Sequence, residues 1–262
     1  LPSLFPFFIC ANLITELSLT RIPARLLGGL MRPVFHLGGA GSAALVLGLV
    51  GGYPAGAQAV AQLYESGSIS QEEAGRLLLF CNNAGPAFVT GVCGVCVLGS
   101  AKAGLLLYAV HVFCALLTGV LLRGPLPDAA PPAAHTSPGK APGFAAAFIT
   151  SVKRAGTNAL QVCMFVVAFS VLSAFLLCLL PEGLPPEVRA LLVGMLELSN
   201  GVLLLGGCRA AFPIAAFLLG FSGLSVCAQA QSLLAPAGLG LGRYLPAKLL
   251  HGTLSALLAL LL

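Results

Sequence analysis

The chain has 262 residues, of which 58% are hydrophobic and only 8% are charged, and its formal net charge is +5. Its mean hydropathy is +1.00. Soluble domains carry roughly a quarter charged residues, so this composition excludes an ordinary water-soluble domain and predicts a surface that faces lipid. The basic residues are scattered among apolar runs and form no patch interleaved with aromatic residues, which argues against nucleic-acid binding.

Apolar stretches that are candidates for crossing about 30 Å of hydrocarbon follow one another along the chain. Two of them are free of interruptions, residues 103–122 and 158–180. The others are shortened or broken by proline, glycine or polar residues, and they cover 1–19, 33–50, 76–100, 188–207, 210–220 and 244–262. Such a mixture of clean and broken spans is more typical of a transporter or channel than of a simple membrane anchor.

The stretch GGYPAGAQA at residues 51–59 directly follows an apolar run, with no charge between them. A backbone break in lipid leaves costly unpaired N–H and C=O groups unless protein or a water-filled cavity satisfies them. We therefore expect Gly52 and Tyr53 at the tip of a re-entrant hairpin or in the gap of a discontinuous helix. Pro54 is expected in the first turn of the half-helix that follows. The free N–H groups of that half-helix would suit a carboxylate. The alternative is a surface loop with Tyr53 at the membrane interface.

Two carboxamides, Asn82 and Asn83, lie deep in the next apolar run, directly before Gly85 and Pro86. Each offers donors and acceptors that would be costly to leave unpaired in lipid. They either bond neighbouring helices or face a ligand. Upstream, residues 70–73 have the spacing of a capping box and predict an ordinary helix start.

Residues 123–143 are rich in proline and alanine and contain few large apolar side chains. This composition predicts a solvent-exposed linker. The linker divides the chain into a first membrane repeat, residues 1–122, and a second, residues 144–262.

Two shorter segments bear on membrane topology. Residues 144–156 form an amphipathic stretch, which we expect to lie along the interface. Arg21, Arg25 and Arg32 cluster in one short connection, and the positive-inside tendency places that connection in the cytoplasm.

The second repeat carries a carboxylate in the motif ELSNG, which contains Glu197, Ser199 and Asn200. An acidic residue inside the membrane indicates a functional site by default. Glu197 could hold a proton or a cation, or accept a hydrogen bond from a substrate. The alternative is a structural partner for Arg209 or Lys248.

The two repeats resemble each other in sequence. Residues 47–63 align with residues 219–234 with a single one-residue gap, and Leu-Gly, a later Gly and Ala-Gln-Ala recur in the same order. Paired interrupted segments of this kind are the best sequence indication of a transporter's binding site. In the second segment the candidate site residues are Ser222, Gly223, Ser225 and Gln229.

Metal and catalytic chemistry find little support. Cys93 and Cys96 have CxxC spacing, but no second Cys or His pair accompanies them. His36, His111 and His251 are isolated in sequence, so we expect no zinc site. No Ser/His/Asp constellation is recognisable, and we expect neither an enzyme nor a bound cofactor.

The motifs LPSLFPFF, GGYPAGAQAVAQLYESGSIS, RLLLFCNNAGPAF, ELSNG and FLLGFSGLSVCAQAQ follow in an order that resembles the YlbJ family of sporulation integral membrane proteins. That family lies within the wider nucleoside-recognition or Gate-domain superfamily. The resemblance covers nearly the whole chain and implies a role in endospore formation, in the mother-cell-derived membrane around the forespore. It also implies movement of dipicolinic acid toward the spore, with site residues in 52–54, 82–86, 197–201 and 220–225.

We therefore expect an all-α polytopic membrane protein with two related, inverted halves, whose re-entrant or broken helices meet at the midplane. The expected function is transport of a small aromatic dicarboxylate through the lipid bilayer, coupled to H⁺ or Na⁺. The alternatives are Gate-type transport of a nucleoside-like or other small solute and a non-transporting scaffold for spore-envelope assembly. Whether the protein forms a homo-oligomer stays open.

Within that expectation Glu197 has a particular role. A bare carboxylate would repel a dicarboxylate in a medium of low dielectric, so Glu197 is expected to serve coupling or gating. When protonated, it could donate a hydrogen bond to the anion. The charge of the substrate would be met by half-helix N-termini after Gly52 and Gly223, helped by Lys248.

Overall fold

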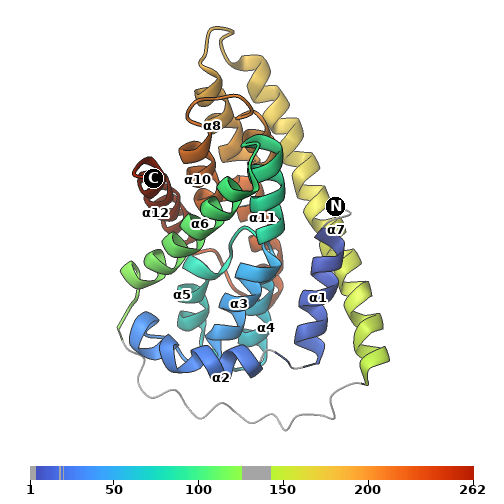
Figure 1. The fold of residues 1–262 in the computed structure, drawn as a ribbon. Coiled ribbons are helices and arrows are strands. Elements are labelled where there is room, and N and C mark those ends of the chain that lie inside the picture. The colour runs from blue at the N-terminus through green and yellow to red at the C-terminus, as the bar shows by residue number, and fades with distance from the viewer. Residues whose placement is uncertain (1–3, 18, 20, 126–142) are drawn as a thin grey trace.

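The computed structural model describes residues 4–17, 19, 21–125 and 143–262, and every regular element in these ranges is a helix (Figure 1). The expectation of an all-α fold is confirmed. The predicted linker, residues 123–143, lies almost entirely outside the described ranges.

The helices of the first part of the chain precede the gap at residues 126–142. They are α1 (Leu4–Glu16), α2 (Arg21–Leu30), the π-helical turn η1 (Met31–Phe35), α3 (Gly41–Gly51), α4 (Ala55–Glu65), α5 (Gln71–Cys81), the π-helix η2 (Phe88–Val97) and α6 (Ala101–Leu121). Those of the second part are α7 (Phe144–Leu179), α8 (Pro186–Leu196), α9 (Leu198–Leu203), α10 (Ala211–Phe221), α11 (Gly223–Leu234), the 3-10 turn η3 (Ala235–Ala237) and α12 (Tyr244–Leu260).

Three helical stretches within the described ranges are long and apolar enough to cross a membrane: Ala101–Leu121, Phe144–Leu179 and Ala211–Ala237. Large apolar side chains stand exposed along the second of these, Leu160, Val167 and Phe175 among them. In water such a surface would be costly, whereas in lipid it is the expected outer face. The protein is thus an α-helical integral membrane protein.

The amphipathic segment 144–156 does not form a separate interfacial helix. It is the first third of α7, a continuous helix of 36 residues. At 1.5 Å per residue this helix is about 54 Å long, longer than the hydrocarbon core. It runs along the whole molecule, from the end where α2 lies to the end where α8 lies (Figure 1).

Two helical hairpins lie toward opposite ends of the molecule (Figure 1). In the first, α3 folds back on α4, and Gly48 lies against Gly56. In the second, α8 folds back on α9, and a Cβ on Gly201 would overlap the Cα of Gly194. Glycine lets the paired backbones approach each other this closely.

Two further helix pairs are interrupted without folding back. Residues 82–87 separate α5 from η2, and Ser222 separates α10 from α11 in a left-handed conformation with φ of 73°. The stretch from α10 through η3 is still long enough to act as one kinked span.

The two segments that the sequence alignment paired differ in shape. That alignment placed α3–α4, residues 47–63, on α10–α11, residues 219–234. The first of these is a hairpin and the second is a kinked helix. In chain order a hairpin, an interrupted helix and a further helix follow one another in residues 41–121 and again in residues 186–260.

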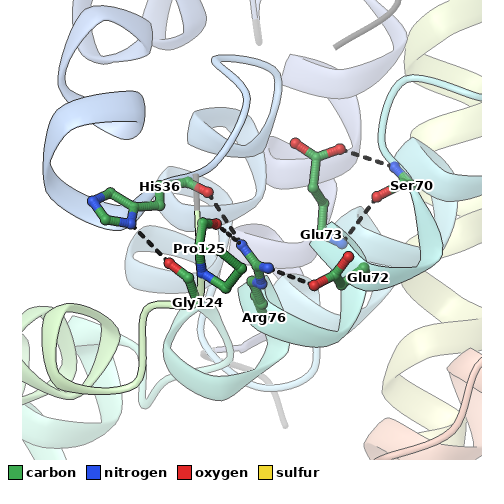
Figure 2. A network of polar contacts seen from close by, with 7 residues as sticks. All are labelled: His36, Ser70, Glu72, Glu73, Arg76, Gly124 and Pro125. Carbon is green, nitrogen blue, oxygen red and sulfur yellow. Dashed lines mark hydrogen bonds and ion pairs between the residues drawn. The ribbon is translucent and has the colours of Figure 1, made fainter. Parts of the chain in front are cut away.

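A polar network ties the start of the linker to the end of the molecule where α2 lies (Figure 2). Arg76 of α5 donates to the carbonyl oxygen of Pro125 at 2.7 Å and to that of His36. The ring Nδ1 of His36 donates to the carbonyl oxygen of Gly124 at 2.8 Å. These bonds bring η1, α5 and the residues after α6 together.

The predicted capping box is present at the start of α5. The Ser70 hydroxyl accepts from the Glu73 backbone N–H, and the Glu73 carboxylate accepts from the Ser70 backbone N–H (Figure 2). The other oxygen of Glu73 accepts from the Gly38 N–H at 2.9 Å. The cap therefore also connects α5 to the loop before α3.

Candidate solute-binding site

A cavity of about 90 Å³ lies where both hairpin tips and the α5–η2 interruption meet α7 and α11. A single buried water needs roughly 10–15 Å³ of such cavity volume, so the space is large enough for several waters or for part of a small solute. Its lining comes from the first tip and the α5–η2 interruption, from the second tip, and from α11 and α7. The residues are Val50–Tyr53, Ala84–Phe88, Val162, Val166, Glu197–Ser199, Val226 and Gln229.

About half of the residues expected in the site line this cavity. They are Gly52, Tyr53, Gly85, Pro86, Glu197, Ser199 and Gln229. The remaining ones are not among the lining residues: Pro54, Asn82, Asn83, Asn200, Ser222, Gly223 and Ser225. Motifs that are up to 177 residues apart, from Gly52 to Gln229, thus contribute to one space.

The first hairpin tip lies against the first interruption through backbone alone. Gly52 has φ of 77°, and a Cβ there would stand 2.9 Å from the backbone N of Gly85. Tyr53 follows and donates its hydroxyl to the carbonyl oxygen of Leu219 in α10 at 2.7 Å. Pro54 precedes the first residue of α4 instead of lying within its first turn. The tip therefore connects the two halves.

Glu197 forms the second hairpin tip. Its backbone is extended between α8 and α9, and one carboxylate oxygen accepts from the Asn200 N–H at 2.7 Å. The side chain is almost fully buried and lines the cavity. No ion pair joins it to Arg209 or Lys248 in the described part of the chain. The carboxylate is left with one oxygen that is not bonded to the hairpin.

Asn82 and Asn83 bond to protein. The Asn82 side chain accepts from the Ala57 N–H at the start of α4 and donates to the Tyr244 hydroxyl at 2.9 Å. The Asn83 side chain donates to the carbonyl oxygen of Phe80 at 2.7 Å. Both are fully buried. Of the two interpretations left open by the sequence, these bonds favour helix-to-helix packing.

Lys248 of α12 reaches the same interruption. Its fully buried ammonium donates to the carbonyl oxygen of Asn82 and to the side-chain oxygen of Asn83. Because Asn82 caps the C-terminus of α5, the ammonium lies at the negative end of that helix dipole, which stabilises it. Sequence reasoning named Lys248 as a helper in charge compensation and as an alternative partner of Glu197, and it missed Asn82 because nothing in the local sequence indicates that partner.

His111 and His251, isolated in sequence, stack on one another with ring centroids 4.7 Å apart. His111 Nε2 accepts from the Ala84 N–H at 3.1 Å, and His251 Nε2 donates to the carbonyl oxygen of His111 at 3.0 Å. His111 thus satisfies a backbone group of the first interruption, and His251 of α12 bonds a backbone carbonyl of α6. Both Nδ1 atoms lack a hydrogen-bond partner within the described residues.

The second interruption is held mainly by backbone packing. A Cβ on Gly223 would stand 3.2 Å from the Leu198 N, next to the second hairpin tip. The Ser222 hydroxyl is buried and has no partner among the described residues. Ser225 accepts from Gln229 within α11.

The contribution of α7 was missed by sequence reasoning. Val162 and Val166 line the cavity, and Ser170, one turn further on, accepts from the Asn200 side chain at 2.9 Å. This part of α7 reads as a uniform apolar span, so no local signal distinguishes the face toward the cavity from the face toward lipid.

Within the ranges that the structure describes, no three His, Cys, Asp or Glu side chains are grouped in a way that could hold a metal ion. Cys93 is buried and Cys96 is exposed, and both are free thiols.

The chain is similar to one curated protein. It is 31% identical over an alignment of 304 residues to the "Sporulation integral membrane protein YlbJ" of Bacillus subtilis (strain 168), covering 100% of this chain and 73% of that relative. No protein-family model matches the chain, and no solved structure matches it. The chain belongs to the YlbJ family of sporulation integral membrane proteins, and it is a multi-pass membrane protein.

Proposed function

We propose that this sporulation-related membrane protein is a transporter of a small solute, and that the cavity between the two hairpin tips is its substrate site. One observation carries the proposal: both hairpin tips, the first interruption and α11 contribute to a single cavity. A scaffold has no need for interrupted helices around a central cavity, since each interruption in lipid must be compensated by other contacts.

The membrane arrangement that we propose makes both hairpins re-entrant and the two halves inverted. The support is that α3–α4 and α8 lie toward opposite ends of the molecule (Figure 1), while both tips line the same cavity. Transporters with inverted repeats bind substrate at such a repeat interface and work by moving one repeat against the other.

The substrate that we propose first is dipicolinic acid, a small aromatic dicarboxylate, carried during endospore formation in the membrane around the forespore. The start of η2 faces the cavity, because its N-cap Ala87 and its first residue Phe88 both line it. The initial N–H groups of a helix have no partner inside it and attract anions. Valine and aromatic side chains in the lining suit the apolar ring.

Glu197 would oppose a dicarboxylate if it stayed ionised, because like charges repel strongly at low dielectric. We propose that Glu197 takes up a proton with the anion and donates a hydrogen bond to it. Binding should then strengthen as the pH falls, since protonation removes the repulsion. H⁺ would serve as the coupling ion.

A neutral, nucleoside-like solute is the second candidate. Among the described residues that line the cavity, Glu197 is the one that carries a charge, and a carboxylate readily accepts hydrogen bonds from sugar hydroxyls or base N–H groups. This candidate also agrees with the resemblance to the Gate-domain superfamily. It predicts binding that weakens or stays constant as the pH falls.

Calorimetric titration of the purified protein with dipicolinate and with nucleosides, over a range of pH, tests both candidates. We expect dipicolinate to bind more tightly at lower pH and Glu197→Gln to bind it with a flat pH profile, because Gln mimics the neutral form. The control is Glu182→Gln, which changes an exposed carboxylate in the turn between α7 and α8. If neither solute binds, or if Glu197→Gln behaves as wild type, the proposed site is wrong.

Transport is tested separately, in proteoliposomes that contain the protein. We expect uptake of dipicolinate that requires protein and increases with an inward proton gradient. Tight binding without uptake would favour the scaffold interpretation.

A further inference from the structure

Lys248 stands behind the wall of the cavity without lining it. Its Nζ lies 5.9 Å from the ring centroid of Tyr53, and Tyr53 lines the cavity. On another side it lies 5.5 Å from the ring centroid of Tyr244. The Lys248 side chain has no exposed surface at all.

The ammonium has no anionic partner. Its hydrogen-bond acceptors are the carbonyl oxygen of Asn82 and the side-chain oxygen of Asn83, both neutral groups. In the described part of the chain, no carboxylate lies within 4.0 Å of it. A buried charge is costly unless it is paired, and its field reaches several ångströms further in a medium of low dielectric than in water.

The other titratable groups around Lys248 do not supply a stable negative charge. They are the phenols of Tyr53 and Tyr244, the thiols of Cys81 and Cys227, and the imidazoles of His111 and His251. The only carboxylate at the cavity, among the described residues that line it, is Glu197 at the second hairpin tip. If Glu197 is neutral, the positive charge of Lys248 is left without a counter-charge in this part of the protein.

We propose that Lys248 is the specificity-determining cation of the site, and that a small organic anion bound in the cavity supplies its missing counter-charge. This inference rests on the proposed function, because it requires that the cavity binds a solute. Lys248 acts at a distance, across the Tyr53 ring, and it is not a direct ligand. It therefore favours anions by their charge and is indifferent to the other features of the solute.

The test compares two solutes of the same shape and different charge: dipicolinate and its neutral analogue pyridine-2,6-dicarboxamide. We expect wild type to bind the anion more tightly than the diamide. Lys248→Gln should weaken binding of dipicolinate by roughly thirty-fold or more, as expected for losing a unit charge about 8 Å from a carboxylate at an effective dielectric near 20. Binding of the diamide should be unchanged.

Tyr244→Phe is the matched control. It removes a hydrogen bond to the same interruption, from the Asn82 side chain to the Tyr244 hydroxyl, and keeps the charge of Lys248. We expect it to leave the preference for the anion intact. If Lys248→Gln weakens both solutes equally, Lys248 is a structural residue and the inference is wrong.

The remaining outcomes separate this inference from the proposed function. If wild type binds neither solute, the solute site itself fails. If wild type binds both solutes equally well, the site stands and the role of Lys248 is refuted, a result that does not depend on whether Lys248→Gln folds.

Discussion

The two helix interruptions, between α5 and η2 and between α10 and α11, are stabilised in opposite ways. Asn82, Asn83 and Ala84 of the first are bonded by side chains from α6 and α12, chiefly His111 and Lys248. Ser222 and Gly223 of the second both have positive φ, and the Ser222 hydroxyl has no partner in the described residues. Side chains of neighbouring helices thus brace the first interruption through hydrogen bonds, whereas the second depends on backbone packing against the Glu197 tip.

This difference indicates which part of the protein would move during a transport cycle. Segments with few internal bonds open at lower free energy than braced ones. The group proposed to take up a proton, Glu197, lies in the less braced half and contacts α11 through the tip. We therefore expect the Glu197 tip and the second interruption to move against the first interruption, with Lys248 of α12 staying in place as a fixed charge because it is bonded to Asn82 and Asn83.

The largest effect should come from the feature that both halves share, the close hairpin. Gly48→Ala would place a methyl group on the Cys81 carbonyl oxygen, and Gly201→Ala would place one on the Cα of Gly194. Because both obstacles are backbone atoms, which cannot rotate away, we expect each variant to lose about 3 kcal/mol of stability or more. Thermal unfolding in detergent measures this loss.

Gly75→Ala is the control for both hairpin variants. A Cβ on Gly75 meets nothing within 4 Å, so this change within α5 should be neutral or slightly stabilising. If only one hairpin variant is destabilised, the two halves do not share the hairpin as a structural unit.

The next largest loss of stability is expected from His111→Ala, which removes a side chain that braces the first interruption. It leaves the buried Ala84 N–H without an acceptor and removes the stacking partner of His251. An unsatisfied buried group costs about 1–3 kcal/mol, and we expect a loss of about 2 kcal/mol on thermal unfolding. Stability equal to that of wild type would show that the first interruption is not braced as described.

A smaller loss is expected from Tyr244→Phe. It removes the hydroxyl that accepts from Asn82 at 2.9 Å and keeps the buried ring. A single hydrogen bond of this kind contributes about 1 kcal/mol net. A loss as large as that of His111→Ala would mean that the hydrogen bonds at the first interruption form one cooperative network.

The smallest effect, and of opposite sign, is expected at the second interruption. Ser222→Gly relieves a left-handed conformation that costs a non-glycine residue about 1–2 kcal/mol and removes a hydroxyl without a partner. Glycine loses more conformational entropy on folding than serine does, which offsets about 0.5–1 kcal/mol of this gain. We expect a net gain near 0.5 kcal/mol, and a clear loss would reveal a bond to Ser222 that forms in another state of the protein.

The class of protein and the places where helices break could be predicted from the sequence alone. Lipid makes every unpaired polar group costly, so Gly52, Asn82, Glu197 and Ser222 stood out from their apolar surroundings. All four lie at hairpin tips or helix interruptions in the structure. The capping box at Ser70 was equally readable, because both partners lie within four residues.

Only the tertiary structure decided which of these breaks belong together and what each polar residue does there. Asn82 and Lys248 are 166 positions apart, and no local periodicity indicates that α12 braces α5. Whether a carboxamide faces a solute or a neighbouring helix depends on rotation about the helix axis, and in an apolar helix that rotation leaves little trace in the sequence. It is set by close backbone contacts such as Gly194 on Gly201, which arise only when whole helices pack.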